Sequence, residues 1–310
     1  MIQALLRICD YIFVLRPLIL IPAWSFYLIG AGESVDGSIP AGFEIPSVWS
    51  FLCLTAVLIT AYLLNQIFDR DSDARNEKCP YLSQGIFGVK TLLFLALGFY
   101  LLASYSFRHL ADAQRIPLIA ALVLSLIYSL PPVRLCTRPI LDLLANAVGF
   151  GGIAFILGFS LARAEPSDRL IMSLPYVLLV GATFLHTTIL DAAGDREAGK
   201  LSTTVLIGTR ASKIGAVVLH AAAVGAAIYT GRPVAMALTS LTLPLTLAAL
   251  PAGGTSRSSI QVQGTTALIT LGAVVMWPAY LLILIPLLLL SRFYHRKRFG
   301  FNYPGIRKDS

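Results

Sequence analysis

Long apolar segments follow one another along most of the chain and restrict what it can fold into. Hydrophobic residues make up 56% of its 310 residues and charged residues only 13%, whereas soluble domains carry about 25% charged residues. The apolar runs have the length of helices and lack the alternation of strands. A segment inside a bilayer must satisfy its own backbone hydrogen bonds, as an α-helix does. The sequence therefore predicts an all-α, polytopic membrane protein.

Nine membrane-spanning helices are predicted, at residues 12–30, 47–67, 88–107, 115–131, 140–162, 170–190, 210–230, 232–250 and 264–291. The last segment contains Pro278 and Pro286. It is interpreted as one kinked helix, because each half would be too short to cross a membrane by itself. No linker divides the chain, so residues 1–291 are predicted to form a single transmembrane domain, followed by a basic tail at 292–310.

Acidic residues recur at intervals of four after two of these apolar runs. Asn65, Asp69 and Asp73 follow the second predicted helix, and Asp191 and Asp195 follow the sixth. Residues four apart lie on one face of a helix, and acidic residues near a membrane are functional candidates. Mg²⁺ prefers oxygen ligands and usually takes carboxylates together with substrate phosphates. The pattern predicts two acidic clusters facing each other across Mg²⁺ ions and a diphosphate; solvated helix ends are the alternative.

Basic residues near both acidic clusters could neutralise the oxygen atoms of a diphosphate. Arg75 and Lys78 follow the first cluster, and Arg196 and Lys200 follow the second. Arg16 lies within the first apolar segment, where an arginine needs an anionic partner. Each has a structural alternative: the first four could belong to solvated loops, and Arg16 could extend to the membrane interface.

The segment Tyr128–Arg134 contains two prolines that end the fourth predicted helix, because proline cannot continue a helix. Tyr128 and Ser129 would then lie at the mouth of a cavity, with Arg134 in the loop beyond. The face of a tyrosine ring can stabilise a nearby cation, including an allylic carbocation. An interfacial tyrosine is the alternative interpretation.

Polar residues and glycines within the apolar segments have structural interpretations, and for one polar pair a role in the cavity is also open. Asp142 and Asn146 could line the cavity or form hydrogen bonds between helices. The glycines between residues 149 and 152 would allow close helix packing. His186 lies five residues before Asp191 and therefore faces away from the acidic pair, so we expect it to be structural.

Several other functions are disfavoured by composition. The four cysteines form no C-x-x-C pair, and the scattered histidines suggest neither a zinc site nor haem ligation. There is no glycine-rich phosphate loop and no G-x-S-x-G motif. The net charge of +8 is spread over loops, which fits anionic lipids or a polyanionic substrate better than nucleic acid.

The distribution of basic residues predicts the orientation in the membrane. With nine helices, more Lys and Arg residues fall on the side of the acidic clusters than on the other side. The positive-inside rule then places the clusters on the cytoplasmic side, and the cell inner membrane is the expected location. The basic tail conflicts with this arrangement, because nine crossings would leave it on the opposite side. The alternative is that 264–291 forms a re-entrant pair, which would return the tail to the side of the acidic clusters.

The combination of motifs resembles the UbiA superfamily of intramembrane aromatic prenyltransferases. The family's motifs are matched in order by Arg16-Pro17, by Asn65, Asp69 and Asp73, by the Y-S-x-P-P-x-R-like segment at 128–134, and by Asp191 and Asp195 within a G-D-R-x-x-G-K-like segment at 194–200. Two positions depart from the family's pattern. Gln66 stands where many members have Asp, and Cys136 stands where Lys is common.

The resemblance implies a nine-helix bundle around a central cavity that opens laterally to lipid. Asp69, Asp73, Asp191 and Asp195, assisted by Asn65, would hold Mg²⁺ on the diphosphate of a polyprenyl donor. The allylic C–O bond would ionise and an electron-rich acceptor would attack the sheltered carbocation. The implied partners are the polyprenyl diphosphate, membrane lipids and a lipophilic acceptor, which could be a quinone precursor, a chlorophyll-type molecule, a carotenoid or another isoprenoid lipid.

Besides the four aspartates, Tyr128 is predicted to take part in catalysis. The residues predicted to bind the substrates are Arg16, Asn65, Arg75, Lys78, Ser129, Arg134, Arg196 and Lys200. A cation or proton transporter, a CDP-alcohol phosphotransferase and a non-catalytic scaffold are the alternative functions. A transporter needs charges along a path across the membrane, and a CDP-alcohol phosphotransferase would leave the second acidic cluster unexplained.

Overall fold

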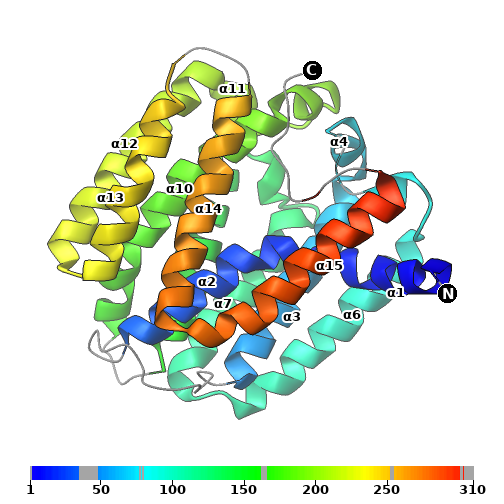
Figure 1. Cartoon of the computed structure of the whole chain (residues 1–310), viewed down its shortest axis with the longest axis horizontal. Helices are drawn as coiled ribbons and strands as arrows, with labels where there is room; N and C mark the ends of the chain where they lie inside the picture. Colours follow the sequence, from blue (N-terminus) through cyan, green and yellow to red (C-terminus); the bar gives the residue numbers. More distant parts are fainter. Residues whose placement is uncertain are drawn as a thin grey trace.

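A bundle of helices makes up the protein in the computed structural model, which describes residues 2–34, 48–76, 78, 80–161, 166–251, 255–300 and 303. These residues contain no strand. Eight helices are long and apolar enough to cross a membrane, and a bent pair near the N-terminus would make nine. The prediction of an all-α membrane protein with about nine spanning helices is confirmed (Figure 1).

The long helices follow one another in the order α1 (Ile2–Phe13), α2 (Pro17–Glu33), α3 (Val48–Phe68), α6 (Val89–Ser106), α7 (Asp112–Ser129), α8 (Leu141–Asn146) continued by η3 (Ala147–Ile153) and α9 (Ala154–Phe159), α10 (Pro166–Glu197), α12 (Thr209–Thr230), α13 (Pro233–Ala248), α14 (Ser256–Met276) and α15 (Leu281–Phe299). The short ones are α4 (Arg70–Arg75), α5 (Pro80–Ser83), η1 (Phe107–His109), η2 (Leu135–Thr137), α11 (Thr203–Ile207) and η4 (Pro278–Tyr280). The segment η3 is π-helical, and α13 is apolar but has only 16 residues.

The first predicted span is broken at Arg16. This residue adopts a left-handed conformation, with φ at 56°, which is uncommon for a residue other than glycine. Pro17 then starts α2, a position that suits proline because the first helical N–H needs no partner. The axes of α1 and α2 differ by 45°. Arg16 therefore lies at a bend and not inside a continuous helix.

The prediction of one helix over 264–291 is wrong. Helix α14 begins earlier, at Ser256, and ends at Met276; α15 then runs from Leu281 to Phe299. With 21 and 19 residues, each is long enough to cross a bilayer separately. The helix ends differ from the predicted ones because α14 begins with polar residues and α15 ends with basic residues, which resemble a loop and a tail in the sequence. Helix α15 thus crosses the predicted domain boundary at residue 291.

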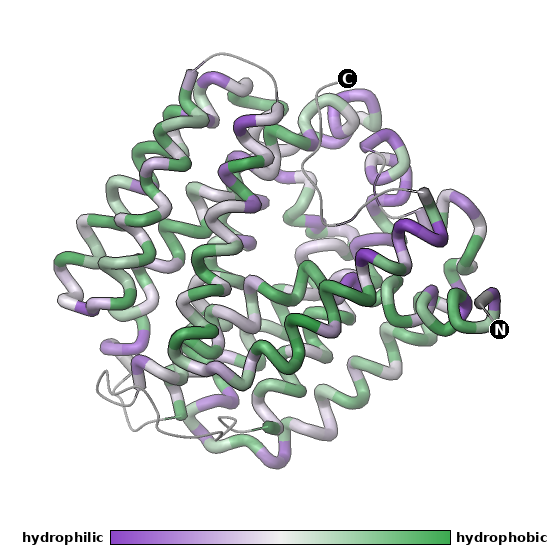
Figure 2. The backbone as a smooth tube through the Cα atoms, in the orientation of Figure 1, coloured by the Kyte–Doolittle hydropathy of each residue, from purple (hydrophilic) through white to green (hydrophobic). Residues whose placement is uncertain are grey.

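Helix α15 returns the chain to the side where it began. Arg298 Nε lies 3.0 Å from Asp10 Oδ1 of α1, and Figure 1 shows the end of α15 beside α1 and α5. Hydrophilic residues gather at this end of the bundle, around α4 and the end of α15 (Figure 2). Arg292, Arg296, Lys297 and Arg298 therefore lie on the side of the acidic motifs, and not opposite them as the predicted topology requires; Arg307 and Lys308 of the predicted tail lie outside the described residues.

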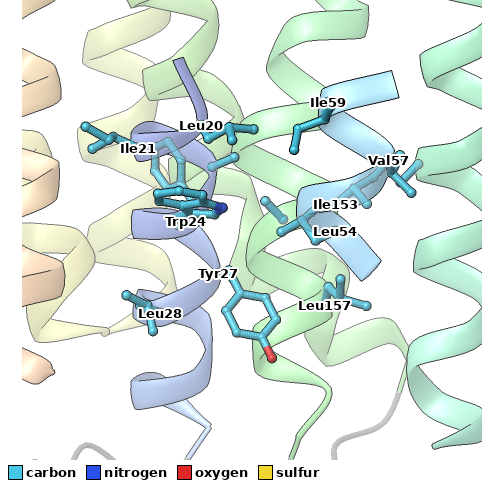
Figure 3. Close-up of a cluster of buried hydrophobic side chains, with 14 of the residues drawn as sticks. Leu20, Ile21, Trp24, Tyr27, Leu28, Leu54, Val57, Ile59, Ile153 and Leu157 are labelled. Carbon is cyan, nitrogen blue, oxygen red and sulfur yellow. The ribbon is translucent and has the colours of Figure 1, made fainter. Parts of the chain in front are cut away.

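Small residues bring the central helices into close contact. A Cβ atom at Gly158 would lie 1.9 Å from the carbonyl oxygen of Tyr27, and one at Gly151 would lie 2.4 Å from that of Tyr176. Only glycine fits at these crossings of α9 with α2 and of η3 with α10, so the packing interpretation of the glycines near 150 is correct. The core beside the first crossing is built by Leu20, Trp24, Tyr27, Leu54, Val57, Ile153 and Leu157 (Figure 3).

Candidate active site

The first acidic cluster lies where α3 meets α4. The chain departs from helical geometry at Asp69, yet two backbone hydrogen bonds preserve the four-residue spacing. They run from Asp69 N to Asn65 O and from Asp73 N to Asp69 O, each 2.8 Å long. Asn65 Nδ2 also donates to Asp69 Oδ2 at 2.9 Å. The spacing seen in the sequence therefore places these three side chains next to one another.

Asp69 is buried between two cations. Arg134 Nη2 lies 2.9 Å from Asp69 Oδ1, and Lys200 Nζ lies 2.8 Å from Asp69 Oδ2. Burial alone would raise the pKa of Asp69, but the charges and hydrogen bonds of Lys200 and Arg134 outweigh it and lower the pKa below its usual value. Arg134 has a left-handed backbone conformation, with φ at 41°. The predicted loop at 128–134 thus supplies one of the two cations that hold Asp69 ionised.

Asp73 has a different environment. Among the described residues, its Oδ2 atom is buried and has no hydrogen-bond partner. Burial raises the pKa of Asp73, and the positive charges of Arg16 and Lys78 oppose this effect only in part. A buried carboxylate oxygen without a donor is costly, and a cation at this position would compensate it.

The second acidic cluster lies at the end of α10 and meets the first one. Asp191 forms an ion pair with Lys78. Asp195 is buried and accepts a hydrogen bond of 3.3 Å from Asn76 Nδ2. A Cβ atom at Gly194 would lie 2.4 Å from Asn76 Oδ1, so this contact requires glycine. Two motifs more than a hundred residues apart are therefore brought together by α4 and α10.

Lys200 connects the two clusters. Its Nζ atom lies 2.8 Å from Asp69 Oδ2 and 4.0 Å from Asp195 Oδ1. Burial alone would lower the pKa of Lys200, but the two carboxylates raise it well above its usual value, so the side chain stays protonated. The loop that carries Lys200 is held by Asp142, whose Oδ2 accepts a hydrogen bond of 2.8 Å from Thr203 N.

A cavity of about 550 Å³ extends from this charged region into the bundle. Arg16 and Lys78 line it at the charged end, and Phe26 and Ile269 line it among apolar side chains. Arg16 and Phe26 are ten residues apart along α2, so the cavity reaches about 15 Å along this helix. One end suits an anion and the other suits a hydrocarbon chain.

The remaining predicted residues divide into two groups. Near the cavity, Tyr128 accepts a hydrogen bond of 2.9 Å from Asn146 Nδ2, and Asn146 itself lines the cavity. Ser129 is fully buried, and its hydroxyl has no hydrogen-bond partner in the described part of the chain. By contrast, Arg75 pairs at the surface with Glu197 at 3.7 Å, and Arg196 is exposed. The structure does not bring these last two arginines into the cavity.

Sequence reasoning missed Asn76, His295 and Tyr303. Asn76 bonds to Asp195, and the other two line the cavity. No pattern marks Asn76, because an asparagine three residues after Asp73 resembles any loop residue. The sequence does carry a signal for the other two, because aromatic residues stand on both sides of the basic run Arg296-Lys297-Arg298, whereas a solvated basic tail needs no aromatic residues.

The described side chains contain no preformed group of three or more Asp, Glu, His or Cys residues that could hold a metal ion. Lys78 and Lys200 pair with carboxylates instead. The available ligand atoms nevertheless fit a hard cation, because they are carboxylate oxygens. In addition, one buried oxygen of Asp73 has no hydrogen-bond partner among the described residues.

The fold is similar to that of several solved membrane proteins. A UbiA homologue from Archaeoglobus fulgidus bound to GPP and Mg²⁺ matches with a TM-score of 0.68 at 20% identity, over 87% of this chain and 99% of that chain. A structure described for digeranylgeranylglyceryl phosphate synthase in membranes matches with a TM-score of 0.62 at 16% identity, over 87% of this chain and 98% of that chain. A UbiA homologue from Aeropyrum pernix K1 matches with a TM-score of 0.59 at 16% identity, over 85% of this chain and 97% of that chain. No match was found among curated proteins.

The helical bundle, the apolar cavity and the paired acidic motifs define an intramembrane enzyme that acts on a lipid carrying an anionic group. The sequence model of the UbiA prenyltransferase family matches residues 19–261, which is most of the chain. The chain therefore belongs to the UbiA prenyltransferase family and is an integral membrane prenyltransferase. This assignment sets aside the transporter, the CDP-alcohol phosphotransferase and the scaffold.

Proposed function

We propose that the protein transfers a polyprenyl group from an allylic polyprenyl diphosphate to an electron-rich, lipophilic acceptor. One observation carries the proposal: Arg16 and Lys78, whose charges act on Asp73, line one end of a cavity that continues about 15 Å among apolar side chains, and Lys78 also pairs with Asp191 of the second cluster. A polyprenyl diphosphate has the same division into a charged head and an apolar chain.

Asp69, Asp73, Asp191 and Asp195 would hold Mg²⁺, with Asn65 orienting Asp69 through its hydrogen bond of 2.9 Å. Magnesium supplies positive charge that stabilises the leaving diphosphate. Asp73 has the strongest need for such a cation, because its buried oxygen has no hydrogen-bond partner within the described residues. The Archaeoglobus fulgidus homologue bound to GPP and Mg²⁺ supports this part of the proposal.

The chain's own cations would bind the diphosphate and stabilise its departure. Arg16 and Lys78 line the charged end of the cavity, while Lys200 and Arg134 hold Asp69 in its ionised form. The allylic C–O bond breaks and its electron pair leaves with the diphosphate, which these positive charges stabilise. Ser129, the last residue of α7 before the loop that presents Arg134, would assist in binding this group.

The resulting allylic carbocation would form between the charged end and the apolar part of the cavity. The apolar walls exclude water, which would otherwise trap the cation, and the ring of Tyr128 would face it. The acceptor's π electrons or lone pair form the new bond to the prenyl carbon, and the acceptor then loses a proton. Suitable acceptors are a quinone precursor, a chlorophyll-type molecule, a carotenoid or another isoprenoid lipid.

The active site would face the cytoplasm from the cell inner membrane, within a single transmembrane domain. The positive-inside rule supports this orientation. Because α15 returns the chain to the side of the acidic clusters, Arg292, Arg296, Lys297 and Arg298 now add to the positive charge of that side.

Diphosphate release from geranylgeranyl diphosphate tests the proposal. Purified protein would be incubated with and without Mg²⁺, together with a panel of aromatic and isoprenoid acceptors. We expect Mg²⁺-dependent release that Asp73→Asn and Asp191→Asn abolish. The matched control is Asp71→Asn, since Asp71 lies on α4 but is exposed. Folded protein that releases no diphosphate from any donor would refute prenyl transfer.

A further inference from the structure

Helix α15 supplies part of the cavity wall that the matched family region does not include. The family match ends at residue 261, before α15 begins at Leu281. His295 of α15 and Tyr303 just beyond it line the same cavity as Arg16 and Lys78. A segment outside the matched region therefore reaches the charged end of the site.

An ion pair between buried Asp10 and the partly exposed side chain of Arg298 holds α15 in place against α1. Asp10 is only 4% exposed. Its Oδ1 accepts hydrogen bonds from Tyr294 Oη at 2.6 Å and from Arg298 Nε at 3.0 Å, and its Oδ2 lies 3.3 Å from Arg298 Nη2. The ring of Tyr294 also stacks on Phe13, with centroids 4.6 Å apart and planes 8° apart. These contacts flank His295 on both sides in sequence, so its position relative to the cavity is well defined.

Aromatic rings surround the cavity where α1 and α15 meet. His295 lies 4.8 Å from Tyr303 and 5.2 Å from Phe13, measured between ring centroids. Phe13, Tyr81, His295 and Tyr303 all line the cavity. Flat, conjugated molecules gain favourable offset-stacked or edge-to-face contacts from such rings, and saturated ones do not.

The location of these rings indicates which of the two substrates, the prenyl donor or the acceptor, packs against them. The apolar end of the cavity, which suits the polyprenyl chain, is lined by α2, α10 and α14, for example by Phe26, Val180 and Ile269. The rings of α15 contact residues next to the charged end: His295 packs against Phe13, three residues before Arg16, and Phe299 packs against Tyr81, three residues after Lys78. Since the donor's diphosphate is anionic, the group that packs against the rings there is the acceptor.

We infer that α15 forms the acceptor-selecting wall of the active site, and that His295 and Tyr303 are specificity-determining residues that favour a planar, conjugated acceptor. This inference rests on the proposed prenyl transfer. It assigns a role to α15 that requires neither residue to contact the diphosphate.

The test compares two acceptors at a fixed donor concentration, a planar aromatic alcohol and a saturated isoprenoid alcohol. The measured quantity is the ratio of their kcat/KM values, which does not depend on the amount of folded enzyme. We expect His295→Ala and Tyr303→Ala to lower the preference for the planar acceptor about tenfold, because the loss of a few pocket contacts changes selectivity by roughly that factor. His295→Trp retains an aromatic face and narrows the cavity, so it should favour the planar acceptor more strongly.

Leu289→Ala is the matched control, since Leu289 lies on the same helix and is 66% exposed. Its acceptor ratio and its KM for the donor should equal those of the parent. Unchanged acceptor ratios in all three test variants of an active parent would overturn the role of α15 alone. A folded parent that releases no diphosphate would instead overturn the proposed prenyl transfer, and this inference with it.

Discussion

Single side chains in this site act mainly by balancing buried charge. Asp69 is buried and ionised because Arg134 and Lys200 contact its two oxygen atoms. Cys136 Sγ, at the position where relatives of this type often have lysine, lies 3.7 Å from Asp69 Oδ1. Lys200, from a loop 64 positions further along the chain, provides positive charge on the other oxygen. The departure from the family's pattern at Cys136 therefore leaves Asp69 with two cationic partners.

Replacing Lys200 should be one of the most damaging single changes. Lys200→Met would leave Asp69 with one cation and would remove the connection to Asp195. We expect kcat/KM for diphosphate release to fall about 100-fold or more, the usual effect of losing one preorganised donor at a developing negative charge. Arg196→Met serves as the control, because Arg196 is close in sequence but exposed. Activity of Lys200→Met within about threefold of the parent would contradict this view of the site.

Gly194 offers a test of the contact between the clusters. Gly194→Ala places a methyl group 2.4 Å from Asn76 Oδ1 and should displace Asn76 from Asp195. Adding Asn76→Ala removes the obstructing amide, so the double variant should bind the donor better than Gly194→Ala alone. Such non-additivity is expected for residues in direct contact. The KM values for the donor, measured for the two single variants and the double variant, quantify this non-additivity. Gly98→Ala is the control, since a Cβ atom at Gly98 would have no neighbour within 4 Å. Additive effects would show that the clash is not the cause.

At the scale of helices, the sequence predicted the elements whose ends carry a clear signal. The acidic motifs were placed correctly at the ends of α3 and α10, because charged residues stop an apolar run. The break between α14 and α15 was missed, since Trp277 and Pro278 are both common in membrane helices. Asn76 could not be predicted, because its partner Asp195 belongs to α10, which meets α4 only in the folded chain.

The ion pair between α1 and α15 predicts unequal effects of removing its two partners. Arg298→Met leaves Asp10 buried with only the hydroxyl of Tyr294, and we expect a loss of about 2 kcal/mol in the free energy of unfolding, the usual range for losing hydrogen bonds to a charged group. Asp10→Asn should have a smaller effect, because about a third of the Arg298 side chain is exposed and water can solvate it. Denaturant unfolding in detergent measures both, with the exposed Arg296→Met as control. Equal losses for both partners would contradict this asymmetry.

For the whole molecule, α15 decides on which side of the membrane its basic last turn, including Arg296, lies. Single cysteines at positions 71, 112 and 296, in a background without the native cysteines, would be labelled with a membrane-impermeant maleimide in vesicles of known orientation. Asp71 lies beside the acidic clusters, Asp112 begins α7 at the opposite end, and Arg296 lies near the end of α15. Because α15 brings the chain back, position 296 should be labelled in the same vesicles as position 71, and position 112 in vesicles of the other orientation. Joint labelling of positions 296 and 112 would place the end of α15 on the side opposite the acidic clusters, and α15 could then not line the active site beside Lys78.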